Sequence, residues 1–92
     1  MEISQLNHVV IERLFKGRQR VIHHRLADLY GMIFASFERQ TSMRADIDNE
    51  ENEIIRHLLE AQLERVIWQR EGWMRESEEL QRELKELEQI ER

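Results

Sequence analysis

Apolar residues recur at helical intervals through the first forty positions of this chain. No proline interrupts the stretch, and the spacing predicts an amphipathic helix over residues 1–40. One stripe of this helix, which we expect to dock on a partner helix, consists of Ile22, Leu26, Leu29, Ile33 and Phe37. A second stripe beside it makes the apolar face wider than a two-stranded contact needs, so the helix should touch more than one neighbour.

Short polar side chains concentrate between residues 41 and 49. Such side chains form hydrogen bonds with their own backbone and compete with helix, so the sequence predicts a turn over 41–49. Asp48 followed by Glu51 resembles a capping box that would begin a second helix. A helix that runs continuously through this segment is the alternative.

Residues 50–92 are predicted to form one long helix, and a heptad repeat runs along it. With Leu59 at a d position, the a and d positions are mostly apolar, and Arg70 and Ser77 are polar exceptions that could set the register. The leucines near the carboxyl end are too exposed on a lone helix, which predicts a parallel coiled-coil dimer through residues 59–91. The expected oligomer interface consists of Leu59, Leu63, Val66, Trp73, Leu80, Leu84 and Leu87.

An extra apolar stripe lies beside this seam in the first half of the long helix, and it consists of Ile54, Leu58, Ala61 and Trp68. We expect it to pack on the stripe of the first helix, with Trp68 as a candidate anchor for another protein. The predicted fold is an all-α helical hairpin and a single domain. Its long C-terminal helix is expected to overhang and to form a coiled coil within an oligomeric helix bundle.

Composition supports long helices and narrows the possible chemistry. The chain of 92 residues has no proline, three glycines and no cysteine, which excludes disulfides, thiolate metal sites and cysteine nucleophiles. The N-terminal residues lack the basic start and apolar run of a signal peptide, and no stretch has the length of a membrane span. We expect a soluble intracellular protein, cytoplasmic or nuclear. The helical pattern still runs at Arg92, which is typical of a fragment of a longer protein.

Charge is unevenly distributed between the two halves. Residues 1–40 carry six Lys/Arg and four Asp/Glu, a net of +2, whereas residues 41–92 carry eight and fifteen, a net of −7. The two halves should therefore attract one another. A basic run in the first half comprises Arg13, Lys16, Arg18, Arg20 and Arg25. It either pairs with the acidic half or contacts a polyanion such as nucleic acid, and the lack of interleaved aromatic residues that could stack bases favours the pairing.

The histidines do not form a metal-binding pattern. His23 and His24 are adjacent on a helix and point in different directions, and no two histidines have the spacing that would chelate one ion. A calcium-loop resemblance that begins at Asp46 fails, because the positions that require Gly and Glu hold Glu51 and His57. We therefore expect no metal, no cofactor and no enzymatic activity.

The function that these patterns favour is a non-enzymatic oligomerisation and docking module of a larger assembly, with a homodimer as the favoured state. One alternative is an obligate subunit of a hetero-oligomeric helical complex. Another is an adaptor for nucleic acid or an acidic surface that uses the basic run. Neither a membrane nor a small molecule is expected as a partner.

Overall fold

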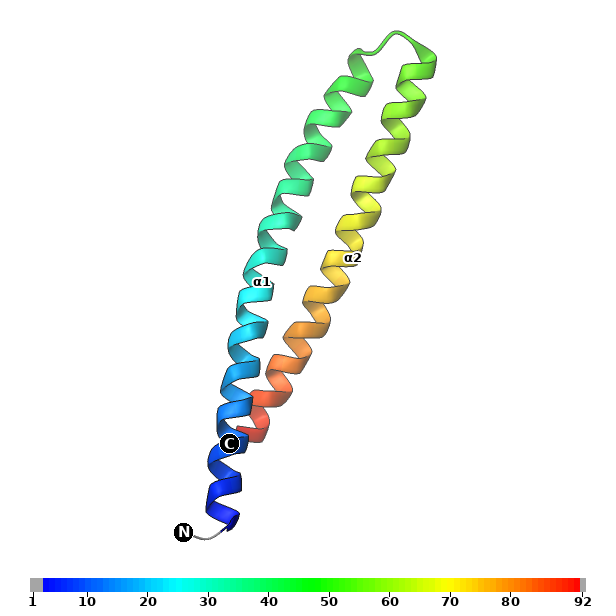
Figure 1. The fold of residues 1–92 in the computed structure, drawn as a ribbon. Helices are drawn as coiled ribbons and strands as arrows, with labels where there is room; N and C mark the ends of the chain where they lie inside the picture. The colour runs from blue at the N-terminus through cyan, green and yellow to red at the C-terminus, as the bar shows by residue number, and fades with distance from the viewer. Residues whose placement is uncertain (1–2, 92) are drawn as a thin grey trace.

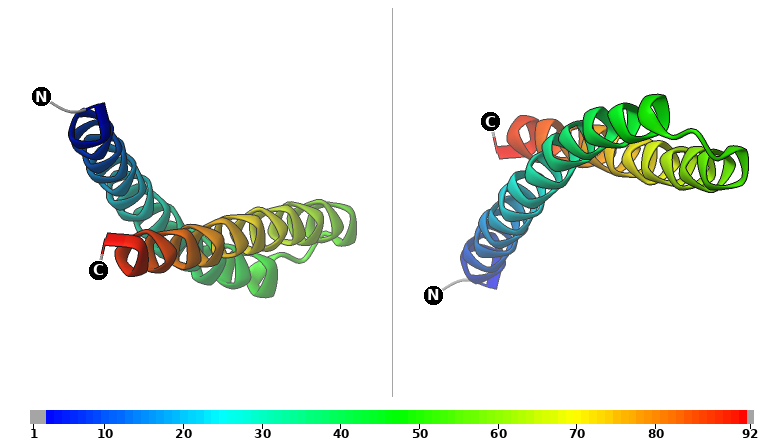
Figure 2. Two further views of the ribbon diagram at one scale, coloured as in Figure 1. Left: turned by 90° about the horizontal axis from the view of Figure 1, so that it is seen from below. Right: turned by 90° about the horizontal axis from the view of Figure 1, so that it is seen from above.

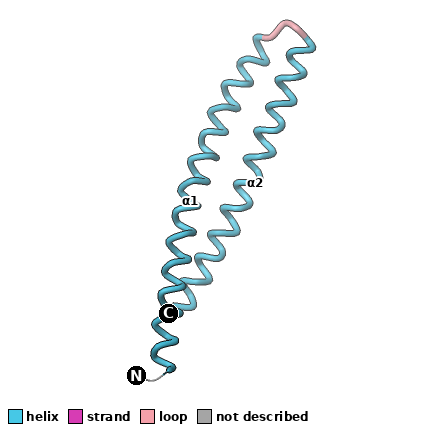
Figure 3. The backbone as a smooth tube through the Cα atoms, in the orientation of Figure 1, coloured by secondary structure: helices cyan, strands magenta, loops and turns pink. Residues whose placement is uncertain are grey.

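Two antiparallel helices make up the fold (Figure 1). The structure is a computed structural model that describes residues 3–91, with side chains described from His8 to Ile90. Helix α1 spans Ile3–Asn49 and helix α2 spans Glu53–Glu91. Within the described range no strand occurs, and the only non-helical residues form the short loop at 50–52 (Figure 3). The predicted all-α helical hairpin is confirmed.

The hairpin is a thin rod. Its extents are 76 × 17 × 14 Å, and in a view along the rod the two helices cross at an angle (Figure 2). The expected overhang of the C-terminal helix is wrong. Instead the amino-terminal end of α1 projects beyond α2 (Figure 1), because α1 has 47 residues and α2 has 39. Positions 1, 2 and 92, which belong to the helices expected over 1–40 and 50–92, lie outside the described residues.

The side chains that face the opposite helix recur in alternating steps of three and four residues, and all of them are buried or half-buried. The series on α1 and the first loop residue, here called the α1 seam, is Phe15, Gln19, Ile22, Leu26, Leu29, Ile33, Ser36, Gln40, Met43, Ile47 and, in the loop, Glu50. The series on α2, here called the α2 seam, is Arg56, Leu59, Leu63, Val66, Arg70, Trp73, Ser77, Leu80, Leu84 and Leu87. These steps keep one face of each helix turned towards its neighbour along the rod.

The core between the two seams is small. Its buried apolar side chains are Ile22, Leu26, Leu29, Met43 and Val66. The chain exposes 7598 Å² of accessible surface, whereas a compact monomer of 11.3 kDa exposes about 5,700 Å². The hairpin therefore leaves roughly 1,900 Å² more surface in water than a compact fold of its mass.

The turn predicted over 41–49 is wrong, because α1 continues to Asn49. Met43 is only 8% exposed and Ile47 is half-buried, so extending the helix by these turns adds apolar contacts with α2. The Thr41 hydroxyl donates a hydrogen bond to the Phe37 carbonyl one turn earlier, at 3.1 Å, so this polar side chain is accommodated in the helix. Burial here outweighs the weak local preference of polar residues for a turn.

The predicted capping box is also wrong, because Asp48 lies inside α1 and Asn52 caps α2. The Asn52 side-chain oxygen accepts hydrogen bonds from the backbone N–H groups of Ile54 at 2.9 Å and Ile55 at 3.2 Å. This oxygen satisfies two of the donors that a helix N-terminus leaves free. On the other side of the loop, Arg56 donates to the Glu50 carbonyl at 3.1 Å through Nε, which ties the two helix ends together.

None of the helices in residues 3–91 is both long enough and apolar enough to cross a membrane.

Candidate protein-interaction surface

The residues predicted to form an oligomer interface lie on the face of α2 that packs on α1. Val66 is 7% exposed, and Leu59, Leu63, Trp73, Leu80, Leu84 and Leu87 are half-buried. The described structure contains only two helices, so α1 of the same chain supplies this burial. Contact of these residues with a second chain stays a prediction.

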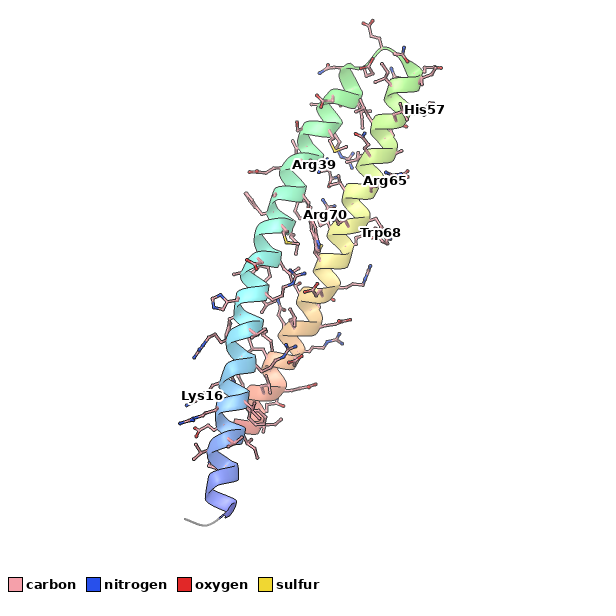
Figure 4. All side chains as sticks on the ribbon, in the orientation of Figure 1. Lys16, Arg39, His57, Arg65, Trp68 and Arg70 are labelled. Atoms are coloured by element: carbon pink, nitrogen blue, oxygen red, sulfur yellow. The ribbon has the colours of Figure 1, made fainter. Side chains whose placement is uncertain are left out.

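The expected packing between the two apolar stripes is wrong. Ile22, Leu26 and Leu29 are buried, but the α2 stripe that was expected to cover them is in solvent, with exposed fractions of 74% for Ile54 and 71% for Trp68. Leu58 is 61% exposed and Ala61 is exposed as well. This stripe lies on the side of α2 that is turned away from α1, because the seam occupies the facing side. Trp68 accordingly points outward (Figure 4).

Arg70 brings a polar group into the α2 seam and points between the helices (Figure 4). It is 8% exposed, its Nη1 donates a hydrogen bond to the Gln40 side-chain oxygen, and its guanidinium lies 3.9 Å from the centre of the Phe37 ring. Gln40 also belongs to the α1 seam, so a polar pair interrupts the apolar core at one level of the rod. Such a pair opposes axial sliding of one helix on the other, because a shift would leave buried polar atoms unpaired.

Two ion pairs join the helices along one flank, here called the ion-pair flank. Arg25 donates to both oxygens of Glu76 at 2.5 and 3.0 Å, and Arg18 makes the same two-pronged contact with Glu83. The hydrogen bonds from Arg25 lower the pKa of Glu76 below its usual value, and those from Arg18 lower the pKa of Glu83. The pairing of the basic run with the acidic half therefore occurs at these two arginines.

The other three members of the basic run take no part in that flank. Arg13, Lys16 and Arg20 are exposed. Lys16 lies 3.6 Å from Glu12 one turn earlier on the same helix, an exposed pair of small energetic weight. Their three- and four-residue spacing places all three on one strip of α1.

The opposite flank of the rod is apolar at its middle and is here called the aromatic flank. Three aromatic side chains of α1 lie there, with exposed fractions of 49% for Tyr30, 66% for Phe34 and 47% for Phe37. Gln81 of α2 donates a hydrogen bond to the Tyr30 hydroxyl, which shows that residues directly following seam positions of both helices share this flank. By the same placement, Ile67 and Met74 of α2 belong to it, Ile67 half-buried and Met74 41% exposed.

Tyr30, Phe34, Ile67 and Met74 are not among the interface residues predicted from the sequence. The available signal was the spacing of the three α1 aromatics, which repeats the three- and four-residue steps of the neighbouring core stripe.

In the described residues, no group of three or more His, Asp or Glu side chains is arranged to hold a metal ion. Comparison with protein-family models, with curated proteins and with solved structures finds no match to this chain. Function is therefore inferred from the geometry of the hairpin alone.

Proposed function

We propose that this hairpin is a non-enzymatic oligomerisation and docking module that self-associates into a helix bundle, with coiled-coil packing between its seams. The observation that carries the proposal is the amount of apolar surface left uncovered. Phe34, Leu14 and Trp68 are each more than 60% exposed. A lone hairpin has no further element that could cover these side chains, so a second molecule would have to do so.

The excess surface has the magnitude of a protein interface. The hairpin exposes roughly 1,900 Å² more than a compact fold of its mass, whereas a stable interface of standard size buries about 800 Å² on each partner, so the excess on one chain is more than enough for one such interface. Association with another hairpin would cover surface of this order and thicken a core that holds few buried apolar side chains. Oligomerisation is a common solution for chains too small to build a sufficient core alone.

Self-association does not require the hairpin to open. The α2 seam is already covered by α1, so a second copy has access to the aromatic flank and to the outer stripe of α2. We therefore place the first contact between copies on these exposed surfaces. The seam contributes by holding the two helices of each copy together.

The mass of the chain in solution across a concentration series tests the proposal. We expect a multiple of 11.3 kDa at high concentration and a fall towards the single-chain mass on dilution. Leu80→Glu with Leu84→Glu should lower both helicity and mass, because charges enter the seam. A well-folded chain that keeps its single-chain mass at millimolar concentration would refute self-association. A chain that folds only when a helical partner is added would instead favour the role of a subunit in a hetero-oligomer.

A polyanion-binding role has one observation in its favour, the exposed strip of Arg13, Lys16 and Arg20. Binding to duplex nucleic acid that falls steeply with salt, and that is lost when all three residues are changed to Glu, would support it. The formal net charge of −5 opposes this role. The absence of binding at low salt would remove it.

A further inference from the structure

The two helices present rows of opposite charge on the aromatic flank. The innermost row on α1 is Lys16, His23, Tyr30, Phe37 and Arg44, and that on α2 is Glu60, Ile67, Met74, Gln81 and Glu88. Every member directly follows a seam residue, as Tyr30 and Gln81 do. Each row is apolar at its centre and charged at its ends, cationic on α1 and anionic on α2.

The rows are aligned along the rod. Arg18 pairs with Glu83 and Arg25 pairs with Glu76, so a step of seven residues forward on α1 matches a step of seven back on α2. Arg44 and Glu60 line one groove near the loop, so they lie at similar levels of the rod. The same steps place Phe37 near the level of Ile67 and Lys16 near the level of Glu88. Tyr30 lies between the levels of Met74 and of Gln81, its hydrogen-bond partner.

The charges next to these rows strengthen the contrast. With the adjacent outer positions included, the α1 side of the flank carries four cations, Arg13, Lys16, Arg20 and Arg44, and one carboxylate, Asp48. The α2 side carries five carboxylates, Glu60, Glu64, Glu71, Glu78 and Glu88, and one cation, Lys85. One half of the flank is therefore positive and the other half negative.

We infer that the occupant of the aromatic flank is a second copy of this chain, related by a two-fold axis along the rod, so that each α1 lies on the partner's α2. This inference rests on the proposed self-association and specifies its surface and orientation. A second copy can cover the flank in two symmetric ways. A two-fold axis across the rod would place α2 on α2 and bring five carboxylates against five. An axis along the rod places cations on carboxylates.

The arrangement along the rod also joins the apolar parts. Tyr30 and Phe37 of each copy then lie near Met74 and Ile67 of the other, with Phe34 beside them. All neighbouring helices in the resulting four-helix bundle are antiparallel, which is a common bundle arrangement. The positive end of each helix dipole then lies beside the negative end of its neighbours. The loops of both copies lie at the same end.

Charge reversal in trans tests the contact. One variant carries Lys16→Glu and Arg44→Glu, and the other carries Glu60→Lys and Glu88→Lys; all four positions are exposed, so the hairpin should keep its helicity. Each variant alone opposes like charges, and its dimer Kd should rise roughly tenfold or more. An equimolar mixture should restore dimer to near the original affinity, which repulsion confined to one chain cannot do. Arg75→Glu with Arg82→Glu, the same charge change on the outer side of α2, should leave Kd within roughly twofold.

A spin label decides the orientation. The chain has no cysteine, so Glu51→Cys in the loop gives a single labelling site. With the two-fold axis along the rod, the two labels should lie within about 25 Å, whereas the crossed arrangement separates them by about 50 Å at 1.5 Å per helical residue.

Labels at the longer distance, or a mixture that stays dissociated while the unmodified chain dimerises, would overturn this inference and leave self-association standing. A single-chain mass at every concentration would overturn both.

Discussion

Truncation of Leu29 to alanine tests the division between the core of the hairpin and its free surface. Leu29 is 0% exposed between the helices, whereas Phe34, little more than one turn later on α1, is 66% exposed. Removing three buried carbons costs about 2.4 kcal/mol at 0.8 kcal/mol for each. The cavity left behind raises the expected loss to about 2.7–5 kcal/mol, a large fraction of the stability of a small domain.

The same truncation at Phe34 should behave differently. At low micromolar concentration, Phe34→Ala should change the free energy of unfolding by less than about 1 kcal/mol, because most of the ring is already in water. The loss of stability caused by Phe34→Ala should grow with protein concentration if the ring also packs against a second copy. Val21→Ala, at a position 56% exposed on another side of α1, is the matched control and should have little effect at any concentration.

Urea unfolding followed by far-UV circular dichroism, repeated over a concentration series, measures all three variants. A free energy of unfolding for Leu29→Ala within about 0.5 kcal/mol of the parent chain would refute the assignment of Leu29 to the core. An equal loss of stability for Phe34→Ala and Leu29→Ala at the lowest concentration would also refute it, since the assigned core would then be on the wrong face.

Three further predictions concern polar groups. Arg70→Ala should cost roughly 1–3 kcal/mol because Gln40 loses its partner, whereas Arg70→Met should stay within about 1 kcal/mol of the parent in thermal and urea unfolding. Asn52→Ala should cost about 1 kcal/mol through loss of the α2 cap, while Asn52→Asp should retain the cap; a melt unchanged by the alanine would contradict the assignment. The ion pairs lower the pKa values of Glu76 and Glu83, which stabilises the folded chain. This stabilisation is fully present above the usual glutamate pKa of 4.5 and is lost as pH falls through the lowered pKa values. Added salt should weaken it. In a variant with both glutamates changed to glutamine, the melting temperature should fall less on acidification than in the parent chain. An equal fall in both chains would exclude these ion pairs as the source of the acid sensitivity.

The position of the loop has a physical basis in the phase of the buried series. Continuing the α1 seam past Ile47 and Glu50 by the same steps would next reach Ile54 and His57, yet both are exposed. The α2 seam begins instead at Arg56, so the apolar face changes phase across the loop. One continuous helix would therefore turn its two seams in different directions, and the hairpin lets both seams be buried against each other.

The sequence alone determined the helical class, the presence of two helices and the positions on α2 that turn away from water. These features depend on local properties: the absence of proline, and a three- and four-residue apolar repeat that marks one face of a helix whatever covers it. The same repeat in α1 contained the core stripe, in which Ile22, Leu26 and Leu29 are buried.

Only the tertiary structure decided which helix covers the α2 seam, where α1 ends, and that Trp68 stays outside. An apolar stripe requires burial, but it is satisfied equally by a second chain or by a distant segment of its own chain. Likewise, the weak preference of residues 41–49 for a turn is outweighed once Met43 and Ile47 can be covered by α2. These outcomes depend on residues far apart in sequence meeting in space, and the local pattern around each one does not contain that information.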